Sequence, residues 1–101
     1  QLFQSQIFFM VYILFMNIND LISNVKKKLK RKIILEDLLI EDKSFLHKNH
    51  SGNVKGKFHL KLTIKSHELK IMSKVERTKK IYNILDHEIK EHIHSLQILI
   101  N

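Results

Sequence analysis

The segment from Phe58 to Ser66 constrains the fold more than any other part of this chain, because it alternates strictly between apolar and polar residues. Its apolar positions are Phe58, Leu60, Leu62 and Ile64. Successive side chains of a β-strand point to opposite faces of the sheet, so this pattern predicts a strand with one buried face. Such a strand needs neighbouring strands and a covering layer of helices or a second sheet.

A first helix is expected to begin close to Met16. Asn17 can act as its N-cap. Its apolar positions recur at helical spacing, at Ile18, Leu21, Ile22, Val25 and Leu29. A cluster of basic residues over Lys26–Lys32 follows at the C-terminal end of the helix, where positive charge suits the helix dipole. Basic residues at a helix end can also bind phosphate groups, although their favourable interaction with the helix dipole explains the cluster equally well.

A second helix is expected to start at the capping-box spacing of Ser73 and Glu76 and to end near Glu91. Its predicted buried stripe consists of Val75, Thr78, Ile81, Tyr82, Leu85 and Ile89. Strands are expected at Leu35–Asp42, antiparallel to the central strand, and at Ile93–Ile100. The predicted order is α-β-β-α-β, an α+β domain in which helices cover one face of a three-stranded sheet.

Residues 1–15 differ from the rest of the chain because they carry no charge. Ile7–Met16 is a run of ten apolar residues, whereas a bilayer span needs about 20. The segment also lacks the positive start and small-residue cleavage site of a secretory signal. We expect residues 1–15 to be an apolar leader outside the functional domain, which covers residues 16–101. A membrane-surface anchor is the alternative, but no membrane partner is expected.

The net charge of +8 over 101 residues suggests an acidic partner, with nucleic acid the first candidate. All but two of the 18 basic residues are lysines, and only Arg31 and Arg77 offer the guanidinium fork that reads guanine edges. A solvated basic surface would explain the charge without any partner. The chain has no cysteine, which excludes disulfides, cysteine nucleophiles and metal sites built from its own thiolates. A reducing, cytoplasmic setting fits this composition.

The sequence offers no motif typical of an enzyme. It has no glycine-rich phosphate loop and no recognisable pairing of a nucleophile with a base. Its acidic residues around the first predicted strand are explained as solvated charges. We therefore expect a binding protein that does not catalyse a reaction.

Histidines are the side chains best suited to chemistry here. The seven are His47, His50, His59, His67, His87, His92 and His94. His67 and His87 are expected to be structural or solvent-exposed. His47 and His50 lie in the polar, glycine-containing segment 43–57, where their H-x-x-H spacing is a weak metal signal. Alternation places His94 on the same face as the apolar residues of the last strand, so periodicity alone predicts a partly buried structural histidine.

Four features in order resemble the BolA family. A loop histidine (His50) is followed nine residues later by a strand histidine (His59), an arginine (Arg77) opens the second helix, and an Ile93-His94 pair begins the last strand. The resemblance covers Met16 to the C-terminal residue. Thr78 is a departure, because many members of the family have histidine after the arginine.

The resemblance implies that the protein pairs with a monothiol glutaredoxin and shares a [2Fe–2S] cluster across the interface, in iron–sulfur cluster trafficking or iron regulation. The C-terminal histidine of the family corresponds to His94. Its loop ligand corresponds best to His50, with His47 as the alternative. The glutaredoxin cysteine and glutathione would supply the thiolates, which suits a chain without cysteine.

The resemblance also implies a second role. The family has a KH-like fold, and some members are described as transcriptional regulators in stress responses. A DNA-binding regulator is therefore the alternative function, with Arg77, Lys79 and Lys80 as candidate phosphate contacts. A KH domain clamps nucleic acid with a GXXG loop between helices, whereas Gly52 and Gly56 are four residues apart between strands. A homodimer is possible in either case.

Overall fold

The computed structural model describes residues 17–44 and 57–101. The apolar leader and most of the segment that carries His47 and His50 lie outside the described residues. The elements are α2 (Ile18–Lys32), β1 (Asp37–Asp42), β2 (Phe58–Lys65), α3 (His67–Lys70), α4 (Lys74–Ile84), α5 (Asp86–Glu91) and β3 (Ile93–Ile100). The expected α+β class is confirmed.

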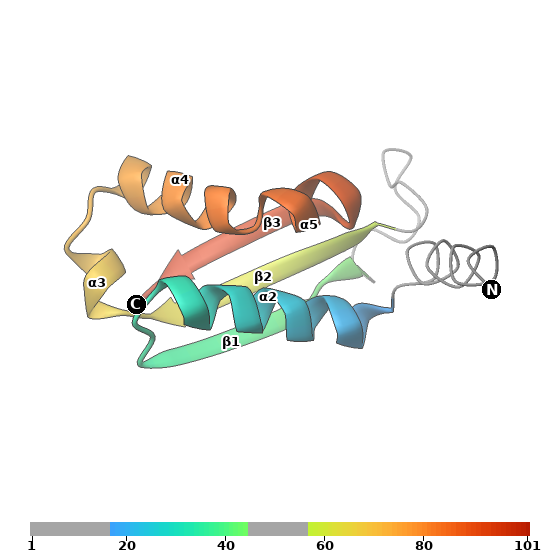
Figure 1. The fold of residues 1–101 in the computed structure, drawn as a ribbon, viewed down its shortest axis with the longest axis horizontal. Coiled ribbons are helices and arrows are strands. Elements are labelled where there is room, and N and C mark those ends of the chain that lie inside the picture. Colours follow the sequence, from blue (N-terminus) through green and yellow to red (C-terminus); the bar gives the residue numbers. More distant parts are fainter. Residues whose placement is uncertain (1–16, 45–56) are drawn as a thin grey trace, which may run out of the picture.

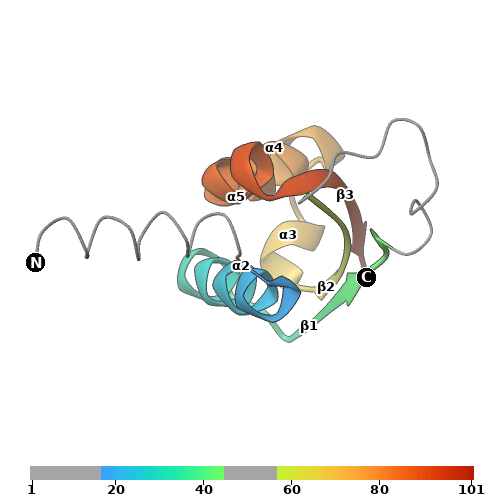
Figure 2. The ribbon, with the colours of Figure 1, turned by 90° about the vertical axis from the view of Figure 1, so that its right-hand side faces the viewer.

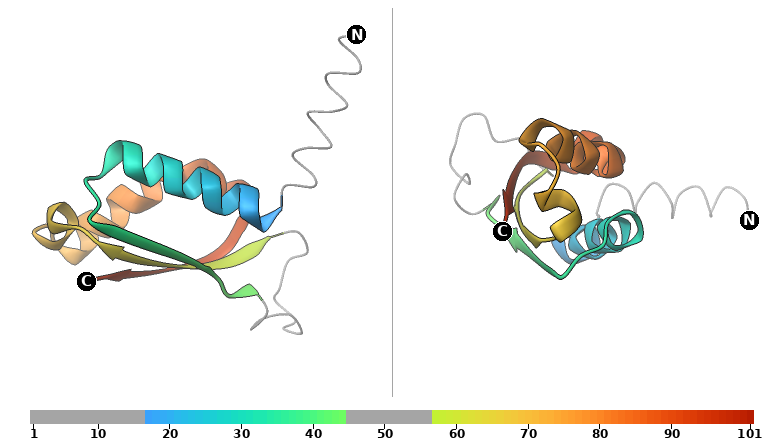
Figure 3. Two further views of the ribbon diagram at one scale, coloured as in Figure 1. Left: turned by 90° about the horizontal axis from the view of Figure 1, so that it is seen from below. Right: turned by 90° about the vertical axis from the view of Figure 1, so that its left-hand side faces the viewer.

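The three strands form one mixed sheet in the order β1-β2-β3 (Figure 1). β1 and β2 are antiparallel, as the sequence predicts, with Leu38 opposite Ile64. β2 and β3 are parallel, with Leu60 opposite Leu96. Parallel neighbours need a long crossover connection, and α3, α4 and α5 supply it. The helices of the described residues lie on one side of the sheet (Figures 2 and 3).

The core lies between the sheet and the helices. The alternating residues Leu60, Leu62 and Ile64 of β2 are almost fully buried and face the helices, as their pattern predicts. The helices contribute Leu21, Val25, Leu29, Leu69, Ile81 and Leu85 to the same cluster. Burial of these side chains is the main stabilising term for a domain of this size.

Two predicted helix starts are confirmed by their capping hydrogen bonds. The Asn17 side chain accepts a hydrogen bond of 2.9 Å from the backbone N–H of Asp20. Ser73 and Glu76 form a complete capping box, in which each side chain accepts from the backbone N–H of the other residue. These bonds satisfy backbone donors that a helix start leaves free.

The second predicted helix differs from the expectation in two ways. It is interrupted at Leu85, whose φ of −99° and ψ of 18° are not helical, so that two helices replace one. Val75 and Tyr82 are 63% and 39% exposed, although both were expected in the buried stripe. Buried Ile81 sets the inward face of α4. Val75 is six residues away, about 240° around the helix, and Tyr82 is about 100° away.

The short helix α3 is a further element that the sequence pattern did not predict. Its N-cap is Ser66, whose side chain accepts from the backbone N–H of Leu69. Within residues 17–44 and 57–101, no helix combines the length and apolar character needed to cross a bilayer.

Candidate functional site

His94 lies at a β-bulge at the start of β3. Phe58 is opposite Ile93, but the next residue of β2, His59, is opposite Ser95, so His94 is the extra residue on β3. Ile93 is buried in the core while His94 is exposed. The expectation that His94 shares a face with the apolar residues of β3 is therefore wrong, because the bulge resets the alternation after Ile93.

His59 is a titratable neighbour of His94. The two rings meet edge to face with their centroids 5.0 Å apart. His59 is buried, and its Nδ1 lies 2.6 Å from the hydroxyl oxygen of Ser95. Its backbone N–H donates to the Ser44 hydroxyl oxygen at 3.0 Å. His59 is thus fixed on three sides and presents its ring to the exposed His94.

The segment that carries His47 and His50 leaves and rejoins the sheet beside this histidine pair. Before it, the backbone N–H of Lys43 donates to the His59 carbonyl at 2.7 Å. After it, the backbone N–H of Phe58 donates to the His92 carbonyl at 2.9 Å. Both ends of the segment are therefore anchored at the end of the sheet where His94 is exposed, although His47 and His50 themselves lie outside the described residues.

Among the described residues, His92 is a second buried histidine at this end of the molecule. It follows α5 as its C-cap, and its ring meets that of His87 at a centroid distance of 6.0 Å. Burial lowers the pKa of His92 below its usual value of 6.5. Electrostatic interaction with His87 and, to a smaller extent, Lys57 lowers it further, against the opposing effect of Glu91 and Glu88. The site therefore favours a neutral imidazole at position 92.

The described residues do not form a complete metal site. Within residues 17–44 and 57–101, no group of three or more histidine, aspartate or glutamate side chains is arranged to hold an ion. His59 and His94 are a pair, and other ligands would have to come from the loop or from another molecule. Sequence alone identified both histidines but gave no sign of their contact, which depends on the bulge.

The three residues predicted to contact nucleic acid lie on α4 but are not equivalent. Lys80 pairs with Glu68 at 3.1 Å, so part of its charge is balanced. Arg77 and Lys79 are two positions apart, about 200° around the helix, and so lie on opposite sides of it. The structure therefore distributes these cations around α4, and their contact with nucleic acid stays a prediction.

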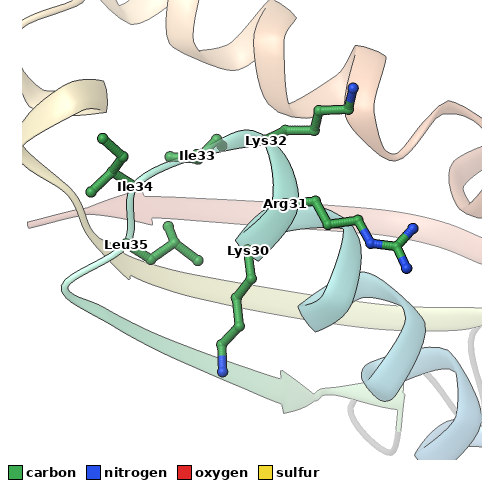
Figure 4. A pocket seen from close by; sticks show the side chains of 6 residues that line it. All are labelled: Lys30, Arg31, Lys32, Ile33, Ile34 and Leu35. Carbon is green, nitrogen blue, oxygen red and sulfur yellow. The ribbon is translucent and has the colours of Figure 1, made fainter.

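The densest group of basic residues lies instead at the C-terminal part of α2. We call it the α2 basic cluster; its members are Lys26, Lys27, Lys30, Arg31 and Lys32, all exposed. Within the part of the chain that the structure describes, none of them pairs with a carboxylate. Residues 30–35 line a hollow of about 340 Å³ at the end of the helix (Figure 4). A second hollow, of about 260 Å³, lies beside α4 and is lined by Lys28, Arg31, Lys32, Asn83 and Ile84.

Comparison with known proteins decides the family. Residues 29–101 match the family model described as BolA-like protein. The chain belongs to the BolA family. Two curated BolA proteins are each 31% identical to it, the Haemophilus influenzae "DNA-binding transcriptional regulator BolA" over 74 residues and the Arabidopsis thaliana "Protein BOLA1, chloroplastic" over 81 residues. The chain spans 69% of the first protein and 50% of the second.

Solved BolA structures have the same fold. The BolA domain of SufE1 from Arabidopsis thaliana is similar with a TM-score of 0.66 and 30% sequence identity, over 78% of this chain and 87% of that one. The solution structure of mouse BolA1 is similar with a TM-score of 0.64 over 78% of this chain and 62% of that one, and at 20% identity it supports the fold alone. The resemblance inferred from His50, His59, Arg77 and Ile93-His94 is thus confirmed at the level of the family.

Proposed function

We propose that this BolA protein is a cytoplasmic adaptor, without catalytic activity of its own, that binds a monothiol glutaredoxin and shares a [2Fe–2S] cluster with it. It would serve iron–sulfur cluster trafficking or iron regulation. The observation that carries the proposal is the exposed imidazole of His94, which the bulge turns away from the core at the end of the sheet. A ligand to a cluster held between two proteins has to be accessible from the partner.

His94 would be one iron ligand, and a histidine of the adjacent loop the other. The resemblance to the family makes His50 the better match and His47 the alternative. Both belong to the segment whose ends are anchored beside His94 through Lys43 and Phe58. The chain has no cysteine, so the partner's cysteine and glutathione would supply the thiolates. Histidine in place of cysteine raises the reduction potential of such a cluster.

His59 and Ser95 act as positioning residues in this proposal. His59 is buried, contacts the ring of His94 and lies 2.6 Å from the Ser95 hydroxyl oxygen. Residues that orient a ligating histidine restrict its ring to a useful direction and tune its basicity. The exposed ligand is thus supported by a buried neighbour, which reduces the conformational entropy lost when a metal binds.

The test is reconstitution of the cluster with the full chain, a monothiol glutaredoxin, glutathione, iron and sulfide. The wild-type mixture should give a heterodimer whose visible absorption and circular dichroism differ from those of the glutaredoxin alone. His94→Ala removes an iron ligand and should abolish that difference. The matched control is His67→Ala, because His67 is an exposed histidine on α3, at the opposite end of β2. An unchanged heterodimer spectrum in His94→Ala would contradict the ligand assignment.

The loop ligand is assigned by the same measurement. If His50 is the ligand, His50→Ala changes the heterodimer spectrum while His47→Ala leaves it unchanged, and the reverse result assigns His47. A double variant that keeps the wild-type spectrum would show that neither loop histidine binds iron.

A DNA-binding regulator is the second candidate function, and the α2 basic cluster is the observation that favours it. The cluster places five exposed cations within seven residues of one helix, and neutralisation of phosphates by such cations is the main source of sequence-independent affinity for DNA. The relative from Haemophilus influenzae is named as a DNA-binding transcriptional regulator. The salt dependence of binding to a labelled DNA duplex tests this function.

A further inference from the structure

The end of the molecule that carries α3 presents exposed apolar side chains. Among the large apolar residues of the described ranges, the three most exposed are Ile34, Ile71 and Val75, at 78%, 72% and 63%. Ile34 lies in the turn between α2 and β1, Ile71 is the C-cap of α3, and Val75 is in the first turn of α4. Single apolar residues are common on protein surfaces, but several at one place indicate a contact surface.

The fold brings these turns to the same end of the molecule (Figures 1 and 3). Two hydrogen bonds of 2.8 Å hold the turn between α2 and β1 against α3: the Glu68 carboxylate accepts from the Ile34 backbone N–H, and the Ser66 hydroxyl donates to the Ile34 carbonyl. Lys80 of α4 pairs with the same Glu68 carboxylate at 3.1 Å. Glu68 therefore connects the turn after α2, the short helix α3 and α4.

Each of these apolar residues has an exposed lysine one or two positions before it. The pairs are Lys32 with Ile34, Lys70 with Ile71, and Lys74 with Val75. We call these six residues the α3-end patch. In the part of the chain that the structure describes, none of the three lysines forms an ion pair with a carboxylate. The patch therefore combines apolar side chains with unpaired positive charge.

The acidic residues at this end are engaged by the backbone. Each of them accepts a hydrogen bond from a backbone N–H group, and in the described ranges they are Glu36, Asp37, Glu68 and Glu76. These bonds stabilise the carboxylates where they are and hold them close to the backbone. Lysine side chains are longer and keep their charged ends in water, so the ammonium groups of the patch can extend beyond the carboxylates toward a partner.

We propose that the α3-end patch is a docking surface for an anionic lipid bilayer. The three aliphatic side chains insert among the lipid headgroups, and the lysines contact lipid phosphates. Peripheral binding of this kind depends on buried apolar area and on the attraction of basic residues to anionic lipids. A bilayer offers both at every point of its surface, so side chains from three separate turns need no matching pockets. A protein partner would need a shaped contact for each turn.

This contact needs no membrane-spanning segment. It departs from the expectation, drawn from the sequence, that the chain has no membrane partner, because the three pairs come together only in the fold. The His94 site lies near the opposite end of β2, about 20 Å away at the rise of a β-strand. His94 therefore stays accessible on the membrane-bound protein, and the membrane contact does not depend on the cluster ligands proposed above.

The first test uses the absence of cysteine, which allows an environment-sensitive fluorophore to be attached at one chosen position of the full chain. Labelled Ile71→Cys should show a blue-shifted emission with vesicles of equal parts phosphatidylcholine and phosphatidylserine, and none with phosphatidylcholine alone. The shift should decrease at high salt. The matched control is labelled Glu91→Cys, at an exposed position at the end of α5, and its emission should not change.

A missing shift at position 71 with anionic vesicles would overturn the proposal, and an acidic protein would then be the better candidate for this surface. An equal shift at positions 71 and 91 would overturn it as well, because the contact would not be confined to the α3 end.

Sedimentation with the same anionic vesicles tests the lysines. Lys70→Gln combined with Lys74→Gln should weaken binding about tenfold or more. Lys26→Gln combined with Lys79→Gln removes the same charge at exposed positions outside the patch and should weaken binding less. Equal weakening by the two double variants would show that only the net charge matters and would contradict a defined docking surface.

The aliphatic side chains are tested in the same way. Ile34→Ser combined with Ile71→Ser should weaken binding, because less apolar surface is buried in the bilayer. Leu39→Ser combined with Leu99→Ser, at exposed leucines of the sheet, should bind like the wild type. Vesicle binding that the substitutions in the patch leave unchanged would place the contact elsewhere in the chain and would overturn the proposal.

Discussion

His92 and His94 are two residues apart and have opposite environments. His92 ends α5 and is buried, while His94 is exposed by the bulge. The buried residue also helps to hold the sheet, because its carbonyl accepts from the backbone N–H of Phe58 at 2.9 Å. His92 thus has a structural role at the junction of α5 and β3, whereas the side chain of His94 is accessible.

The lowered pKa of His92 predicts how stability depends on pH. The unfolded chain binds a proton at this histidine near its ordinary pKa of 6.5, but the folded chain binds it only at lower pH. Above both pKa values His92 contributes no pH dependence. As the pH falls below about 6.5 the unfolded state gains protons that the folded state does not, so the free energy of unfolding decreases down to the folded pKa. His92→Gln should reduce this decrease in urea titrations at about pH 7.5 and 5.5.

The control for this prediction is His67→Gln, since His67 is exposed. It should retain the full pH dependence of the wild type. If His92→Gln and the wild type lose equal stability between the two pH values, the buried imidazole is not the group responsible.

At the residue scale, the sequence predicted burial along β2 correctly but not the surroundings of His94. Alternation correctly placed Leu60, Leu62 and Ile64 in the core. It failed at His94, because a bulge adds one residue without changing the residue types around it. The contact between His59 and His94 depends on that bulge and on the pairing of strands distant in sequence, neither of which periodicity specifies.

At the scale of elements, a salt bridge connects α2 to α5. The Lys28 ammonium of α2 lies 2.7 Å from one carboxylate oxygen of Glu88 and 2.9 Å from the other. Glu88 is on α5 and its side chain is only 4% exposed. A buried carboxylate is costly without a partner, so this pair fixes how α2 and α5 are placed over the sheet.

Loss of Lys28 should therefore destabilise the fold more than loss of a neighbouring lysine. Lys28→Met leaves the Glu88 carboxylate buried and unpaired, and should lower the free energy of unfolding by about 2 kcal/mol, because the partly exposed lysine keeps the effect below that of a fully buried pair. Lys27→Met, at an exposed position on the same helix, should change it by less than about 0.5 kcal/mol. Urea unfolding measures both.

A double variant distinguishes the attraction between Lys28 and Glu88 from the cost of leaving the Glu88 carboxylate buried and unpaired. Lys28→Met combined with Glu88→Met replaces both charges with apolar side chains and should recover most of the lost stability. A double variant as unstable as the sum of the single variants would instead show that the two residues act independently.

The helices and strands themselves were largely predictable, and their interruptions were not. The caps at Asn17 and Ser73 were visible because a helix start requires particular side chains at fixed spacing. The interruption at Leu85 carries no proline or glycine. It separates α4, which packs against α2, from α5, which packs against β3. Tertiary packing of this kind overrides local helix propensity.

At the scale of the whole molecule, the positive charge is unevenly balanced. Four of the lysines pair with carboxylates in the described part of the chain, and these lysines are Lys28, Lys43, Lys80 and Lys90. They lie on four different elements or their flanks. The cations of the α2 basic cluster form no ion pair with a carboxylate there, so a dense group of unpaired cations lies at the C-terminal part of α2.

This distribution predicts which cations dominate any binding to DNA. The logarithm of the binding constant should fall linearly with the logarithm of the salt concentration. The magnitude of this slope should decrease by about 0.9 for each phosphate contact removed. Lys30→Gln combined with Arg31→Gln should therefore reduce the slope by about two, whereas Lys79→Gln on α4 should reduce it by at most one. Fluorescence anisotropy with a labelled duplex measures these slopes.

The salt dependence reports charge alone, so a regulator also requires one duplex sequence to be preferred over another at constant salt. Equal affinity for all DNA sequences would show that binding is electrostatic attraction alone. If the Lys30 and Arg31 substitutions leave the slope unchanged, the α2 basic cluster is not the contact surface.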